Sequence, residues 1–192
     1  MKPDQYFGKS KGAFPAAGIV GSESEWMDMG TISVPNGILW AGDLFAMDED
    51  AGCSVKVAKG QYRVQIKGMD FKGHRRSSRV RAFLATESQP SLGAKCGEVS
   101  VDCGLMGIYD GTAFKKTVGA KYAQQYGREV MAATMEEIVD CIGFTYAGKT
   151  FELAFLPPGL GDGTYPIYSL EATGKSVGVE VELLPLGFKV TG

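Results

Sequence analysis

Apolar and polar residues alternate in residues 61–67 and again in residues 78–86, and this alternation restricts the fold more than any other feature. The apolar positions are Tyr62, Val64, Ile66, Val80, Ala82 and Leu84. Because successive side chains of a β-strand point to opposite faces, a period of two places each apolar set on one buried face. The two segments therefore predict an antiparallel hairpin, with residues 68–77 forming a long loop.

A helical period is found only between Asp110 and Ile142. The first stripe, with residues spaced by four, consists of Phe114, Val118, Tyr122 and Tyr126. This spacing predicts a helix over residues 112–126 that packs on the sheet, starts at a cap formed by Asp110 or Thr112, and ends at Gly127. A second stripe with similar spacing contains Met131, Met135, Ile138 and Ile142.

Short apolar runs separated by turn residues predict further strands on both sides of the helical region. They cover residues 31–34, 38–40, 98–109, 150–156, 164–170 and 176–184. The pair Asn36-Gly37 favours a turn, and the glycine-rich residues 159–163 favour a hairpin turn rather than a phosphate-binding loop, because a strand and not a helix follows them.

The order of strands, one or two helices and strands indicates an α+β fold. We expect a predominantly antiparallel sheet, sandwich-like or strongly bent, with the helices inserted between Asp110 and Ile142. Residues 30–192 are expected to form a single β-rich domain, and residues 1–29 an irregular N-terminal arm.

Length and charge restrict the class of protein. A chain of 192 residues fits one domain, and its 20 basic and 22 acidic residues give a net charge of 20 − 22 = −2. Domains that coat nucleic acid are usually strongly basic, so nucleic acid is not an expected partner. The apolar runs are far shorter than the roughly 20 residues of a membrane helix, and the N-terminus lacks the apolar core of a signal peptide. We therefore expect a cytoplasmic protein without membrane contact.

The cysteines do not form a metal-binding pattern. They are Cys53, Cys96, Cys103 and Cys141, with no Cys-x-x-Cys pair, and His74 is the only histidine. Structural zinc sites usually bring ligands in closely spaced pairs, so we expect no metal, no cofactor and four small buried thiols. The acidic residues 48–52 lack the glutamate of a calcium loop, because Lys59 occupies its twelfth position, and are expected to form a solvated turn.

Several short segments rich in turn residues are distributed over residues 30–184. They are GTISVPNG (30–37), AGDLF (41–45), GQYRV (60–64), VDCG (101–104), YD (109–110) and GDGTYPIY (161–168). In this order they resemble an uncharacterised bacterial family, domain of unknown function 4241. The chain departs from the family's pattern at Leu44, where the family favours proline. The resemblance implies a compact β-rich fold, and it brings no established activity and no catalytic residues.

Four aspartates lie next to glycines or at strand ends. They are Asp43, Asp102, Asp110 and Asp162. If their carboxylates converge, they have the chemistry to bind a divalent cation or to act as paired acid and base. The competing interpretation, which we favour, is that each accepts hydrogen bonds from backbone N–H groups in its own turn or helix cap.

Four basic residues fall on one face of the expected hairpin, where an acidic protein partner or nucleic acid would dock. They are Arg63, Lys67, Arg79 and Arg81, and Lys72, Arg75 and Arg76 extend the set. The competing interpretation is an ion-paired sheet face, because Glu180 and Glu182 also point away from the core of their strand.

Two further arrangements carry less weight. Cys103 and His74 are the only candidates for a Cys–His nucleophile pair, and we expect Cys103 to be an ordinary buried thiol. A small-ligand site between sheet and helix, near Trp40 and Tyr109, is a third and weaker alternative.

These observations predict a non-catalytic binding module that acts on a protein partner, of which an immunity-like role against a toxin is one form. The alternative is a hydrolase or metal-assisted enzyme that uses the four aspartates. The sequence does not settle whether the chain is an enzyme, although it favours a binding role, and it leaves the oligomeric state open.

Overall fold

The structure is a computed structural model that describes residues 3, 18–19, 21–45, 52–71, 74–136, 139–185 and 189–190. Most of the expected acidic turn at residues 48–52, residue Lys72 and most of the expected N-terminal arm lie outside this part. Within it, the first long strand begins at Met27, slightly before the boundary expected at residue 30.

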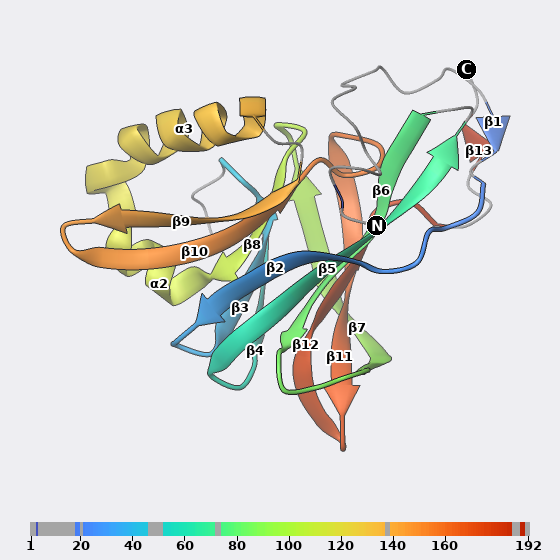
Figure 1. The fold of residues 1–192 in the computed structure, drawn as a ribbon, viewed down its shortest axis with the longest axis horizontal. Helices are drawn as coiled ribbons and strands as arrows, with labels where there is room; N and C mark the ends of the chain where they lie inside the picture. Colours follow the sequence, from blue (N-terminus) through green and yellow to red (C-terminus); the bar gives the residue numbers. More distant parts are fainter. Residues whose placement is uncertain are drawn as a thin grey trace.

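The chain forms two antiparallel sheets and a helical layer (Figure 1). The six-stranded sheet has the order β2 (Met27–Val34), β5 (Gly60–Phe71), β6 (His74–Leu84), β12 (Lys175–Glu182), β11 (Gly163–Ala172) and β7 (Ser91–Val101). The five-stranded sheet has the order β4 (Gly52–Lys56), β3 (Ile38–Asp43), β8 (Met106–Asp110), β10 (Lys149–Leu156) and β9 (Asp140–Tyr146). Strands β1 (Gly18–Ile19) and β13 (Lys189–Val190) form a separate pair. The expected α+β class with predominantly antiparallel sheets is confirmed.

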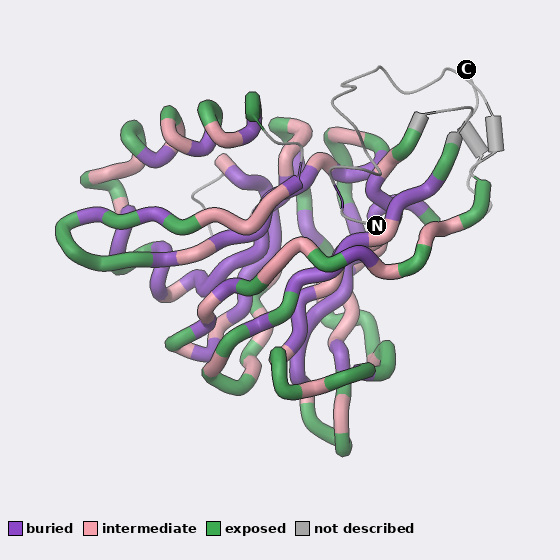
Figure 2. Tube along the Cα trace, in the orientation of Figure 1, coloured by how far each residue is buried: buried purple, intermediate pink, exposed green. Residues whose placement is uncertain are grey.

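The two sheets pack face to face around the main core (Figure 2). The six-stranded sheet contributes the residues expected from the alternation, including Tyr62, Val64, Ile66, Val80 and Ala82, none of which is exposed. The five-stranded sheet contributes Leu39, Ala41, Ile108, Ala154 and Leu156. The period of two therefore predicted the buried face of the β5–β6 hairpin correctly.

The other face of the five-stranded sheet is covered by the helices α2 (Gly111–Thr117) and α3 (Gly119–Glu136). Aromatic rings fill this second core, which contains Trp40, Tyr109, Phe114, Tyr126, Phe144, Phe151 and Phe155. Tyr109 stacks on Trp40 with ring centroids 4.6 Å apart, and Phe114 lies 4.8 Å from Tyr109. Because Trp40 and Tyr109 are buried in this packed core, the weaker alternative of a small-ligand site beside them receives no support.

The helix boundaries differ from the expected ones. A single helix to Gly127 was expected, but α2 ends at Thr117 and Gly119, the first residue of α3, takes a positive φ of 45°. Only glycine adopts this conformation readily, so the chain turns there. Gly127 lies inside α3, where glycine costs about 1 kcal/mol relative to alanine and is tolerated by a packed helix. The second expected helical stretch to Ile142 is also wrong beyond the end of α3, since Ile142 belongs to β9.

Three of the expected connections are also wrong. Residues 68–77 do not form a long loop, because β5 continues to Phe71 and β6 starts at His74. Residues 98–109 are not one strand, because β7 and β8 belong to different sheets. Residues 159–163 join β10 to β11 across the two sheets and are not a hairpin turn. Local apolar patterns do not distinguish a hairpin from a crossing between stacked sheets.

Within the described residues, no helix has both the length and the apolar character required to span a membrane.

The turn between β11 and β12 gives a prediction about stability. Thr173 and Gly174 both have positive φ, 50° and 74°, which a β-branched residue adopts only with strain. Asparagine tolerates this region, so Thr173→Asn is expected to raise the free energy of unfolding by about 0.5–1 kcal/mol. Urea denaturation measures the change. Thr173→Ala is the control, because alanine keeps a Cβ but lacks the tolerance of asparagine for positive φ. An equal gain in the free energy of unfolding from Thr173→Ala would contradict the explanation.

Candidate functional site

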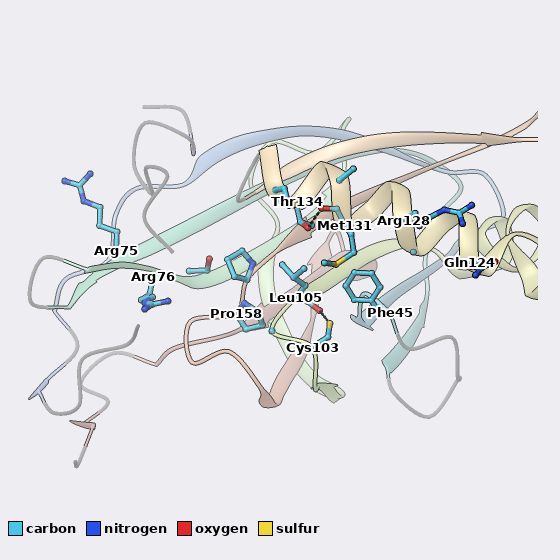
Figure 3. Close-up of a pocket in the computed structure, with 16 residues that line it drawn as sticks. Phe45, Arg75, Arg76, Cys103, Leu105, Gln124, Arg128, Met131, Thr134 and Pro158 are labelled. Carbon is cyan, nitrogen blue, oxygen red and sulfur yellow. Dashed lines mark hydrogen bonds between the residues drawn. The ribbon is translucent and has the colours of Figure 1, made fainter. Parts of the chain in front are cut away.

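A groove of about 1110 Å³ lies between α3 and three loops, which follow β3, β7 and β10 (Figure 3). Its apolar lining consists of Phe45, Leu105, Met131, Ala132, Met135, Pro157 and Pro158. In Figure 3 the side chain of Met131 points from α3 toward Leu105 and Phe45. The site is therefore an open and mostly apolar surface feature rather than a polar cleft.

Helix α3 is fixed over the sheet by two tyrosine hydroxyl groups. Tyr126 donates a hydrogen bond to the carbonyl oxygen of Leu44 at 3.1 Å, next to the groove residue Phe45. Tyr146 of β9 donates to a carboxylate oxygen of Glu129 at 2.6 Å. Because these bonds join the helix to the loop after β3 and to β9, the wall of the groove is held in place without an occupant.

The groove uses a face of α3 that the sheet leaves uncovered. Tyr126 and Val130 face the aromatic core and are 1% and 0% exposed, whereas Met131 and Met135 are 51% and 75% exposed. The expectation that these methionines share a stripe like that of the first helix is wrong. The helix packs through Tyr126, Val130 and Thr134, and the methionines lie on the neighbouring face.

Among the described residues that line the groove, every acidic or basic side chain is an arginine. Arg75 and Arg76 come from the start of β6, and Arg128 comes from α3. Figure 3 shows the first two at one end of the groove and Arg128 at the other. The guanidinium group binds carboxylates in a bidentate manner, so Arg128 favours an acidic group on an occupant.

Asp43 holds together the two loops on one side of the groove, and its carboxylate binds backbone groups of these loops. Its carboxylate accepts hydrogen bonds from the backbone N–H groups of Phe45, Asp102 and Cys103, at 2.8, 2.7 and 2.9 Å. The Cys103 thiol donates to the same carboxylate at 3.1 Å. Burial acts to raise the pKa of Asp43, but these hydrogen bonds outweigh it and hold the pKa below its ordinary value of 3.8.

Asp110 is also a capping residue. It is the N-cap of α2 and accepts a hydrogen bond from the N–H of Ala113 at 2.9 Å. It also accepts one from the backbone N–H of Asn36 at 2.7 Å. The favoured interpretation, in which the aspartates satisfy backbone groups, is thus confirmed for Asp43 and Asp110.

The four aspartates do not converge in one site. Asp43 pairs with Met106 and Asp110 pairs with Leu39, so the two lie at opposite ends of the β3–β8 pair, about 13 Å apart at roughly 3.3 Å per residue. Asp102 and Asp162 are exposed near the loop after β7, where a Cβ on Gly104 would lie 3.8 Å from Asp162 Oδ1. In the described part of the chain, no three His, Cys, Asp or Glu side chains are placed to hold a metal ion.

The four basic residues share one face of the six-stranded sheet, as expected, but acidic and aromatic side chains cover them. Arg79 forms ion pairs with Glu23, Glu180 and Glu182 at 2.9, 3.0 and 2.7 Å. Lys67 also pairs with Glu23, and Arg63 pairs with Asp28.

Arg81 donates two hydrogen bonds to the side chain of Gln65 and lies 4.0 Å from the ring centroid of Trp26. The interpretation as an ion-paired face is confirmed for Glu180 and Glu182, the two residues that suggested it. Binding of a partner by Arg63, Lys67, Arg79 and Arg81 stays a prediction.

The expectation of four buried thiols is wrong. Cys96 and Cys103 are exposed, and Cys53 and Cys141 are only partly buried. For Cys103, desolvation and the hydrogen bond to Asp43 raise the pKa from its ordinary 9.0 to about 11, so the thiol is poorly suited to act as a nucleophile. The side chain of His74 lies outside the described residues.

Comparisons with protein-family models, with curated proteins and with solved structures found no match for this chain. The resemblance to domain of unknown function 4241 therefore stays a prediction. The geometry of the site is the basis for the functional argument.

Asp43 gives a pH-dependent prediction. Because its pKa is lowered on folding, its carboxylate stabilises the protein above pH 3.8, and this contribution disappears as the pH falls through the folded-state value. Asp43→Asn is expected to lower the free energy of unfolding by about 2 kcal/mol at neutral pH and by much less in acid. Urea denaturation at several pH values measures the difference, with exposed Asp102→Asn as the control. An Asp43→Asn effect that does not change with pH would contradict this account.

Cys103 gives a second prediction. A pKa of about 11 instead of 9.0 leaves roughly 100-fold less thiolate at neutral pH, so alkylation of this exposed thiol is expected to be slower by about that factor than for a small thiol. Mass spectrometry after iodoacetamide treatment measures the rate. Asp43→Asn removes the negative charge beside the sulfur and is expected to accelerate the reaction. Rapid alkylation of the unaltered protein would instead indicate an activated nucleophile.

Proposed function

We propose that this chain is a non-catalytic, cytoplasmic binding protein of bacterial type, and that its groove receives an acidic, amphipathic segment of a protein partner. The observation that carries the proposal is the exposed Met131–Met135 face of α3 beside Leu105 and Phe45. An immunity-like role, in which the occupant belongs to a toxin, is one form of this function.

The chemistry of the groove supports a peptide occupant. Methionine is flexible and polarizable, so it packs against apolar side chains of varied shape. Recognition of an amphipathic segment by an apolar groove is a common mode of peptide binding. Arg128, at one end of the groove, favours a carboxylate on the segment's polar positions.

The alternative function, a hydrolase or metal-assisted enzyme, receives less support. Two of its four aspartates already accept hydrogen bonds from backbone N–H groups: Asp43 from Phe45 in its own turn and from Asp102 and Cys103, and Asp110 from Ala113 in the helix that it caps. Catalytic acids and bases need a partner placed to shift their pKa toward the working pH, whereas the pKa of Asp43 is shifted away from it.

A peptide-display selection with defined variants tests the proposal. Peptides selected on the unaltered protein are expected to combine apolar residues with Asp or Glu. They are expected to bind at least about tenfold more weakly to Met131→Glu, which places a negative charge in the groove. Leu92→Glu is the matched control, because Leu92 is equally exposed at 51% but lies on β7 away from the groove. Arg128→Ala is expected to lower the affinity for these peptides. The affinity of this variant is also expected to depend less on salt concentration.

Peptides that bind Met131→Glu and Leu92→Glu equally well would overturn the proposed site. A second arm uses dodecanoate, an apolar carboxylate of small size. Dodecanoate could bind with one-to-one stoichiometry and lose affinity in Met131→Glu, while no peptide binds the groove. In that case the groove is a small-molecule site and the protein-binding function is wrong.

A further inference from the structure

The two open edges of the β-sandwich bring two cysteines together. Cys53 lies in β4, the edge strand of the five-stranded sheet, and Cys96 lies in β7, the edge strand of the six-stranded sheet. The thiol of Cys53 points at the carbonyl oxygen of Cys96 at 4.0 Å, and each thiol affects the pKa of the other. The cysteines are 43 residues apart in sequence, so only the packing of the sheets creates this pair.

A β-bulge directs Cys96 toward this contact. In the pairing of β11 with β7, Ile167 lies opposite Gly97 and Tyr168 lies opposite Lys95, so Cys96 is the extra residue of the bulge. A bulge re-aims the side chain at its position. The thiol of Cys96 lies 3.5 Å from the carbonyl oxygen of Ile167.

Gly97 provides the space for the second thiol. A Cβ at this position would lie 2.7 Å from the sulfur of Cys53, which is closer than atoms of this kind approach. The bulge, the glycine and the two edge strands therefore all contribute to one small thiol site. This site is separate from the groove, because neither cysteine lines it.

We propose that Cys53 and Cys96 form a reversible disulfide that joins the two sheets, with a low-molecular-weight disulfide such as oxidised glutathione as the oxidant. The exposed thiolate of Cys96 attacks one sulfur of the oxidant, whose S–S bond breaks and releases one small thiolate. The thiolate of Cys53 then attacks the sulfur of Cys96 in the mixed disulfide and releases the second small thiol. Two protein thiols are oxidised by two electrons, and one small disulfide is reduced to two thiols.

The experiment treats the full chain with oxidised glutathione at mildly alkaline pH, because burial raises the pKa of both thiols. Mass spectrometry is expected to show the loss of two hydrogens, and peptide mapping is expected to locate the bond between Cys53 and Cys96. The disulfide closes a long loop and is expected to raise the thermal unfolding midpoint by roughly 5–10 °C.

Two variants separate the steps. Cys53→Ala is expected to stop at a glutathione adduct on Cys96. Gly97→Ala is expected to slow ring closure at least tenfold by displacing the Cys53 sulfur, whereas Gly143→Ala, whose Cβ meets only Glu152 Cγ at 3.8 Å, is the control. A lasting adduct on Cys96 in the unaltered protein, a disulfide with another cysteine, or two thiols that stay reduced would each overturn the proposal.

Discussion

The structure depends on a five-stranded sheet that is buried on both faces. Its central strands β3, β8 and β10 place Ala41, Ile108 and Leu156 against the other sheet, while Trp40, Tyr109 and Phe155 lie under the helices. Burial of a large apolar side chain contributes about 1.5–3 kcal/mol, so a sheet with two apolar faces requires both covering layers. Helices α2 and α3 form the second of these layers, and α3 also forms one wall of the groove.

The groove follows from how α3 meets this sheet. The aromatic core accepts the face of the helix that carries Tyr126 and Val130, and the hydroxyl group of Tyr126 joins it to Leu44. The neighbouring face, with Met131 and Met135, faces the loops that carry Phe45 and Leu105 and the start of β6. An exposed apolar surface of this kind typically marks a site of interaction. The turn that Asp43 organises fixes one side of the same surface.

Part of this structure could be predicted from the sequence. Alternation fixed the buried faces of β5 and β6 and predicted that Arg79 and Glu180 would share an outer face, because a period of two depends only on local geometry. The N-cap role of Asp110 and the bond from the N–H of Phe45 to Asp43 were predictable for the same reason, whereas the bonds from Asp102 and Cys103 to Asp43 join distant segments and were not. The separation of β7 from β8 into two sheets and the crossing at residues 159–163 were not predictable, since they depend on contacts between distant segments.

The groove was missed because Met131 and Met135 carry the same four-residue spacing as a buried stripe. The contact between Cys53 and Cys96 was missed because it requires a bulge and the packing of two edges.

The most direct measurement of the central claim uses NMR spectra of the methionine methyl groups. The chain has eight methionines, of which Met131 and Met135 line the groove and Met69 and Met106 are fully buried elsewhere. When an acidic amphipathic peptide binds, the account predicts that the signals of Met131 and Met135 shift and saturate together while those of Met69 and Met106 stay unchanged. Binding that leaves the signals of Met131 and Met135 in place would contradict the account.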